Sequence, residues 1–336
     1  MSIENQLKLD LNRAAGKRKY PSELDNRVYR LFDEHWEKKG PSFINTWRKK
    51  YGSIAVLAAS LLLFSGVAYA STYLYNLHAN NISIEVSAEP NLQFSQAQLN
   101  EIRASIQEVR QQLSAGESAF VYINQLDRVK LPGAPTGMGL TKVNQPQAYT
   151  DIKQWKELVQ VNFAGIKTPE ELPKGFTFSR GELESPIGML DAASMAKYYK
   201  PLQQQAAAAK QNMAWQKASA QDKEAPSDFI SESPRLVYIN SSRDQIEISY
   251  SVVPSSDKNT DMKIKTSTSS TADHVKVAGV DAYYTVNSNS FLSETGIVKD
   301  INWLEQQNGR TLLYHVTSPS INVSKEDLLF VANHMR

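Results

Sequence analysis

The chain has 336 residues, of which 41% are hydrophobic and 21% charged, so it is long enough for about two domains with a sizeable buried core. It contains no cysteine, which excludes disulfides, thiolate nucleophiles and cysteine-based zinc or iron–sulfur sites. The net charge of +2 is uneven, because residues 1–50 carry 12 Lys and Arg against 7 Asp and Glu, whereas residues 78–336 carry 25 against 28. This balance is atypical of nucleic-acid binding, and we expect no nucleic-acid partner.

The first strong helix pattern occupies residues 21–41. Ser22 is a suitable N-cap, and Asp25 stands at the capping-box position. Opposite its charged side the helix presents an apolar stripe, which consists of Leu24, Val28, Leu31, Phe32 and Trp36. We expect the stripe to bind a soluble cytoplasmic protein, with Phe32 and Trp36 as anchors. A helix that only lies on the inner leaflet of the membrane, and a self-association seam, are the alternatives.

The next feature is an apolar run from Ser53 to Tyr75, which is 23 residues long and carries no charge. A helix of this length crosses ~30 Å of hydrocarbon. Basic residues precede it at Arg48–Lys50, and no Lys or Arg lies between Tyr51 and Gln98. The positive-inside rule then predicts one transmembrane helix within residues 51–77, with residues 1–50 cytoplasmic and the remainder extracellular. A cleaved signal peptide is the alternative, because Ala68-Tyr69-Ala70 has the form of a cleavage site.

Residues 78–165 are predicted to form a membrane-proximal α/β region. Alternating apolar residues from Ile82 to Ser87 predict a strand, and Ser95 begins a helix pattern that continues to about Ala115. Further along, in residues 166–336, a strand is expected at Phe176–Ser179 and a long helix from Pro186 towards Trp215. The Ala-rich middle of this long pattern favours a helix at the surface.

After Pro234 the sequence changes to short strands of period two, separated by turn residues such as Gly279 and Asn308-Gly309. The expected strands are 236–239, 245–253, 262–268, 274–277, 281–286, 298–304 and 311–317. Ser324 with Asp327 begins a final helix that has an apolar side. The predicted fold class is therefore α+β, with a curved antiparallel sheet, covering helices and Trp303 in the core.

The sequence carries no recognisable motif for catalysis, metal binding or cofactor binding. The five histidines lack ligand spacing, and the glycines of residues 131–149 do not match a phosphate-binding loop. Glu182 and Glu184 form the closest carboxylate pair, but such pairs in strands usually belong to a solvated face. We therefore expect no enzyme activity, no cofactor and no metal.

Several short motifs resemble a known family. They are LPKGF at Leu172–Phe176, V-x-G-V-x-A-Y at Val277–Tyr283, a W-to-G-R-x-L-L-Y pair at Trp303–Tyr314, and a terminal S-K-E-D-L-L helix from Ser324. Together they resemble, over residues 168–336, the C-terminal domain of unknown function of single-pass envelope proteins of Gram-positive bacteria. Those domains look like distant relatives of the lipoprotein-carrier (LolA-like) and periplasmic sigma-regulator (RseB-like) folds. PSELDNRV at Pro21–Val28 is also similar to the helical segment before the membrane span of anti-sigma-type regulators, without their His and Cys zinc ligands.

These features predict a single-pass regulator or sensor in the cell membrane. Its extracytoplasmic α+β domain would bind a ligand or a protein, or would respond to an envelope condition. Its inner helix would hold a cytoplasmic protein partner. The resemblance implies a sigma factor as that partner, and the lipid bilayer is the other. The alternative is a membrane-anchored envelope binding protein that carries a hydrophobic or lipid-like ligand in its concave sheet and has no signalling role.

Overall fold

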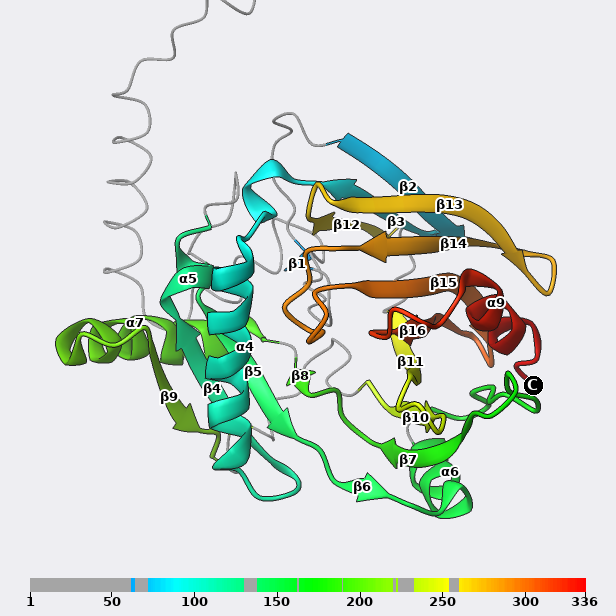
Figure 1. Ribbon diagram of the computed structural model, residues 1–336, viewed down its shortest axis with the longest axis horizontal. Helices are drawn as coiled ribbons and strands as arrows, with labels where there is room; N and C mark the ends of the chain where they lie inside the picture. Colours follow the sequence, from blue (N-terminus) through cyan, green and yellow to red (C-terminus); the bar gives the residue numbers. More distant parts are fainter. Residues whose placement is uncertain are drawn as a thin grey trace, which may run out of the picture. The chain divides into compact units, whose positions relative to one another are not determined.

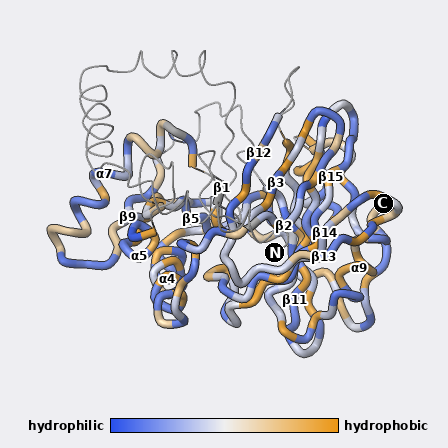
Figure 2. The backbone as a smooth tube through the Cα atoms, turned by 90° about the horizontal axis from the view of Figure 1, so that it is seen from above, coloured by the Kyte–Doolittle hydropathy of each residue, from blue (hydrophilic) through white to orange (hydrophobic). Residues whose placement is uncertain are grey.

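The computed structural model describes residues 62–63, 72–129, 138–161, 163–188, 190–219, 222, 233–253 and 260–336 (Figure 1). These residues form an α+β fold with mostly antiparallel sheets, which confirms the predicted fold class at that level. Hydrophobic and hydrophilic residues alternate along many strands, as expected for sheets with two different faces (Figure 2).

The largest sheet has eight strands, and every neighbouring pair in it is antiparallel. In spatial order they are β13 (Ser270–Val277), β14 (Val280–Asn287), β15 (Val298–Gln307), β16 (Arg310–Ser318), β11 (Gln245–Val253), β10 (Arg235–Ile239), β7 (Thr177–Glu182) and β6 (Ala148–Tyr149). The predicted hairpin turns are confirmed, since Gly279 and Gly309 have φ values of 88° and 75°. These left-handed conformations suit the two-residue turns that join twisted strands.

Two smaller sheets have four strands each. One contains, in order, β1 (Leu62–Leu63), β12 (Thr260–Thr266), β3 (Ile82–Ala88) and β2 (Thr72–Ala79). In it β12 leaves the predicted meander and pairs in parallel with β3. The other contains β8 (Ile187–Gly188), β5 (Leu140–Gln145), β4 (Glu117–Ile123) and β9 (Met213–Lys217).

The helices cover sheet faces, as Figure 1 shows for α4 over β4 and β5. The described helical elements are η1 (Pro90–Leu92), α4 (Gln96–Gln111), α5 (Asn124–Asp127), α6 (Ile152–Gln160), α7 (Ala192–Ala209) and α9 (Lys325–Asn333). Capping boxes begin α4 at Ser95 and α9 at Ser324, where the sequence predicts the helices to start.

The largest core lies between one face of the eight-stranded sheet and helices α6 and α9. Trp303 is 1% exposed there, which confirms its predicted burial. The indole of Trp155 lies against Gly181, where an added Cβ would be 2.3 Å from the ring, so this close approach requires glycine. The indole Nε1 also donates to the carbonyl oxygen of Glu182 at 2.9 Å and so ties α6 to β7.

The predicted long helix from Pro186 to Trp215 is wrong at both ends. The helix α7 begins at Ala192 and ends at Ala209, and Met213–Lys217 is instead the edge strand β9 paired with β4. Lys210 has a φ of 55°, a left-handed conformation that ends helices. Pairing with β4 therefore decides the conformation of these residues, against the helical pattern of the sequence.

Part of the predicted transmembrane segment is β-structure. Thr72–Leu77, expected as the end of the helix, belongs to β2, and Leu62–Leu63 form β1. The reason is tertiary, because Tyr75 and Leu77 are buried in a core shared with β11, β15 and β16. Within the described residues, no helix has both the length and the apolar character needed to cross a membrane. The rest of the predicted segment and all of residues 1–50 lie outside the described residues.

Candidate functional site

The face of the eight-stranded sheet opposite Trp303 carries a continuous row of polar side chains. Residues paired directly across neighbouring strands have side chains on the same face. The register therefore aligns one residue from each of seven strands, namely Glu182, Arg235, Ser249, His315, Asn302, Tyr283 and His274. We call these seven residues the polar row. Glu247, Thr317 and Asp300 lie beside it on the same face, two residues along their strands.

At the β7 end of the polar row, arginines and glutamates form a charge cluster, which we define as Arg180, Glu182, Arg235 and Glu247. The guanidinium of Arg235 donates from Nε to Glu182 Oε2 and from Nη1 to Glu247 Oε2, each at 2.5 Å. Arg180 Nε donates to the other oxygen of Glu182 at 2.7 Å. Arg235 is 9% exposed, so its charge is compensated almost entirely by protein groups.

Electrostatics favour the ionised forms of Glu182 and Arg235. Burial acts to raise the pKa of Glu182, but the charge and hydrogen bond of Arg235, with the hydrogen bond from Arg180, outweigh it and hold the pKa below its usual range. Burial acts to lower the pKa of Arg235, and Glu247 and Glu182 reverse that effect, so its pKa is raised. Arg110 on α4 is close enough to be affected by this cluster. Burial, together with the like charge of Arg235, lowers the pKa of Arg110. Its Nε donates to Gln145 at 3.3 Å.

The middle of the polar row is organised around Asp300. Its carboxylate lies 2.9 Å from His315 Nδ1 and accepts hydrogen bonds from Thr317 and Asn302 at 3.0 and 3.2 Å. The side chains of His315 and Asp300 are each 13% exposed. An imidazole held in this way has its Nε2 directed away from the carboxylate. Within the described part of the chain, the buried Oδ1 of Asn302 has no hydrogen-bond partner.

The far end of the polar row lies under β2. The ring of Tyr75 stacks on that of Tyr283, with centroids 4.6 Å apart and planes 22° from parallel. Leu77 packs in the same cluster, against Leu304 and Leu313 of the eight-stranded sheet. The first long strand of the described chain therefore contacts a member of the polar row directly.

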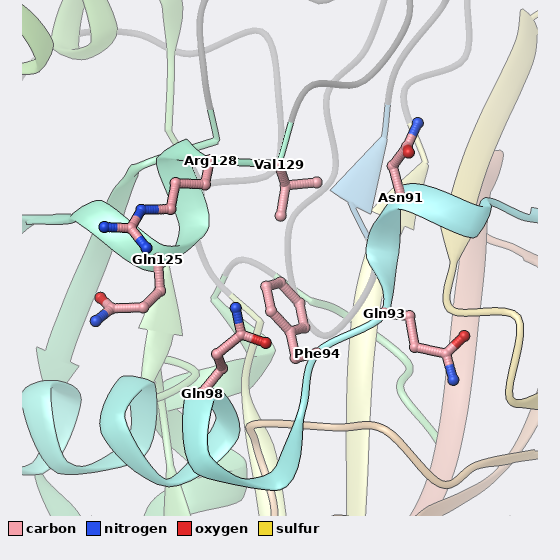
Figure 3. Close-up of a pocket in the computed structure, with 7 residues that line it drawn as sticks. All are labelled: Asn91, Gln93, Phe94, Gln98, Gln125, Arg128 and Val129. Carbon is pink, nitrogen blue, oxygen red and sulfur yellow. The ribbon is translucent and has the colours of Figure 1, made fainter.

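A separate pocket of about 290 Å³ lies beside η1, the beginning of α4, and α5 (Figure 3). Figure 3 shows Gln125 and Arg128 on one side, Asn91 and Gln93 on the other, and Phe94 with Gln98 between them. Val129 completes the lining, which is mainly polar. None of these residues belongs to the polar row, so the pocket is a second candidate site.

The structure places only some of the sequence-predicted site residues. The predicted partner-binding residues Leu24, Val28, Leu31, Phe32 and Trp36 all lie outside the described residues, so their role stays a prediction. The expectation that Glu182 lies on a solvated face is wrong, because Glu182 is 4% exposed and paired with two arginines. In the part of the chain that the structure describes, no group of three or more His, Asp or Glu residues is placed to hold a metal ion.

Sequence reasoning did not find the polar row. Its signal is present, because polar residues such as Ser249 and His315 alternate with buried residues in strands that the sequence predicts. The alternation of residues along one strand shows which of them share a face. Which residue of the neighbouring strand lies opposite them depends on register and strand order. The row becomes visible only when seven strands are aligned.

Comparisons of the chain with known protein families, curated proteins and solved structures return no match. The resemblance to single-pass envelope proteins therefore stays a prediction from short motifs.

Proposed function

We propose that the chain is a single-pass membrane regulator whose outer α+β region senses a ligand or an envelope condition through the polar row, and whose inner helix holds a cytoplasmic protein. A sigma factor is the partner that the resemblance favours. The proposal assigns no catalytic role to the polar row.

The observation that carries this proposal is the position of β2. This strand begins at Thr72, inside the predicted membrane segment, and contacts the polar row through the stacked rings of Tyr75 and Tyr283. A regulator needs such a connection, because a change at the binding surface must reach the segment that leads to the membrane. A passive anchor needs no contact of this kind.

The alternative, a carrier of a hydrophobic ligand, has less support. A carrier needs an open apolar surface inside the sheet. Here the apolar face of the eight-stranded sheet is filled by α6 and α9, and Trp155 and Trp303 are 0% and 1% exposed. The other face carries the charge cluster and Asp300, whose charged groups are costly to bring against a lipid chain.

The proposal is tested first at the inner helix. Full-length protein would be captured with its bound proteins from bacterial cells, as the wild type and as Phe32→Ala with Trp36→Ala. If these residues anchor a partner, the double variant loses one defined protein, since truncating an anchor typically weakens binding about 30-fold. Arg30→Ala with Glu37→Ala is the matched control, because it removes one charge of each sign from the opposite side of the predicted helix. Identical captured proteins in all three samples contradict the proposal.

The membrane topology needs its own test. Protease added to intact protoplasts is expected to digest the region after Leu77 and to spare residues 1–50. The opposite pattern contradicts the proposed orientation. A soluble fragment that begins at Ser71 in the medium identifies the signal-peptide alternative instead.

A further inference from the structure

One wall of the pocket of Figure 3, formed by η1 and the residues before α4, is held by hydrogen bonds within the protein. The carboxylate of Glu89 caps η1 and accepts hydrogen bonds from the backbone N and side-chain Nδ2 of Asn91 at 3.4 and 3.1 Å. Asn289 then clamps the backbone of Phe94, whose N–H donates to Oδ1 at 2.8 Å and whose carbonyl accepts from Nδ2 at 2.7 Å. A wall held in this way loses little conformational entropy on binding.

The amide groups of the pocket present donors. Gln98 uses its Oε1 in the capping box of α4, where it accepts from the N–H of Ser95 at 2.8 Å. Gln93 uses its Oε1 to accept from the hydroxyl of Thr268. With its carbonyl oxygen engaged, Gln98 has its Nε2 group free to meet a ligand beside Arg128.

Arg128 supplies the charge of the pocket. The adjacent carboxylate of Asp127 is engaged elsewhere, because it accepts from Tyr122, Tyr199 and Gln203 at 2.7, 2.6 and 2.9 Å. Burial, together with the hydrogen bond to Asp127, raises the pKa of Tyr122 to about 12, so this phenol stays a neutral donor. Arg128 forms no ion pair with any residue that the structure describes.

Gln125 adds an unsatisfied polar group to the wall. The residue is 5% exposed, and its Oε1 is buried without a hydrogen-bond partner among the described residues. A buried acceptor in this state costs stability until a water or a ligand supplies a donor.

We propose that this pocket binds a small ligand through a carboxylate, with Arg128 and the amide of Gln98 as its donors. One guanidinium with a neutral amide matches a group of charge −1, whereas a phosphate of charge about −2 at pH 7 would remain half-compensated. Phe94 and Val129 face the apolar part of the ligand. The volume of about 290 Å³ is at the lower end for ligand pockets and suits a dipeptide or one sugar ring.

The test uses the full chain in detergent and four small molecules. N-acetyl-alanyl-alanine offers a peptide carboxylate, and the corresponding C-terminal amide is the same peptide without the charge. Glucuronate offers a sugar carboxylate, and inorganic phosphate offers a different anion. Saturation-transfer NMR detects weak binding at millimolar concentration. We expect at least one carboxylate to bind and the amide not to bind, and the better carboxylate identifies the source of the ligand.

Three variants locate the site. Arg128→Gln is expected to weaken carboxylate binding by at least tenfold, because it removes the charge-assisted hydrogen bonds. Gln98→Glu keeps an acceptor for the Ser95 N–H, and thus the capping box, while it places a negative charge in the wall. The Gln98→Glu variant is expected to abolish carboxylate binding. Lys174→Gln removes an exposed charge elsewhere and is expected to bind like the wild type.

Several outcomes overturn the proposal. They are binding of the amide as tight as that of the carboxylate, binding of phosphate alone, no binding of either carboxylate to the wild type, and unchanged binding by Arg128→Gln. A thermal midpoint for each variant shows that it is folded. Because binding is measured directly on the pocket, this result is independent of the topology and partner experiments on the proposed regulator.

Discussion

The two faces of the eight-stranded sheet differ in what they contribute. On one face Trp303 and Tyr314 stack with centroids 5.0 Å apart, and α6 and α9 exclude water from them. On the other face the polar row is only partly covered and holds its charges in pairs. Apolar burial stabilises a fold through the area removed from water, whereas buried ion pairs contribute little net stability because desolvation offsets their attraction. The same strands therefore pack a large apolar core on one side and hold paired charges on the other.

The largest expected effect tests the apolar face. Trp303→Ala should reduce the free energy of unfolding by about 4 kcal/mol, because it leaves a cavity the size of an indole in a closed core. Thermal or denaturant unfolding of the full chain measures it. Ile321→Ala is the control, because Ile321 is 59% exposed and should change stability by less than about 0.5 kcal/mol. Equal effects of the two variants would contradict the assignment of this face as the core.

The second effect tests the charge cluster. Arg235→Met should reduce the free energy of unfolding by about 3 kcal/mol, because Glu182 and Glu247 lose the guanidinium that compensates them. Adding Glu182→Gln and Glu247→Gln should restore part of the loss, since the uncompensated charges are then gone. Chemical denaturation compares the single and triple variants. A triple variant less stable than the single one would mean that packing, and not charge, dominates this end of the sheet.

A third, smaller effect is pH dependence. The folded-state pKa of Glu182 is held below its unfolded value, so its ionised form stabilises the fold. This contribution is fully present above the unfolded pKa of about 4.3 and is lost as the pH falls through the lower folded pKa. The stability difference between wild type and Glu182→Gln should therefore be constant above about pH 5 and shrink in acid. A difference that persists unchanged in acid would exclude this source.

The smallest expected effect on stability tests the middle of the polar row. His315→Gln should change the free energy of unfolding by less than about 1 kcal/mol, because Asp300 keeps its hydrogen bonds from Thr317 and Asn302. If the polar row senses a ligand, the same variant alters the amount of partner captured through the inner helix. His334→Gln, at the C-cap of α9 and outside the polar row, is the matched control. A variant with unchanged stability and unchanged capture would make His315 neutral and weaken the proposed role of the row.

The sequence predicted the elements better than their arrangement. The start of α4 at Ser95, the start of α9 at Ser324 and the tight turn at Gly309 are confirmed, because caps and turns depend on neighbouring residues. The strand at Thr72–Leu77 was missed, because an uncharged apolar run suits a membrane helix and a buried strand alike. Trp215 was assigned to a helix for a similar reason, since pairing with β4 cannot be read from local propensity.

The candidate site was harder to predict than the fold. Asp300 and His315 stand in strands that the sequence predicts, and Arg235 directly precedes one, but nothing local distinguishes them from other polar strand residues. Their meeting depends on the order of strands, in which β11 lies between β16 and β10. Long-range pairing of this kind follows from the whole sheet and not from any one segment.

The parallel pairing of β3 with β12 has a consequence for synthesis of the chain. Ser87 and Lys265, whose side chains are hydrogen-bonded across this pair, are 178 residues apart in the sequence. During translation the β2–β3 hairpin emerges long before its neighbour exists, so one edge of β3 stays open until β12 leaves the ribosome. Contacts of such high sequence separation form slowly, because a long loop must close before they are gained. A nascent chain that ends before β12 would expose an apolar strand edge. Such a chain would have to be bound by chaperones or degraded by proteases.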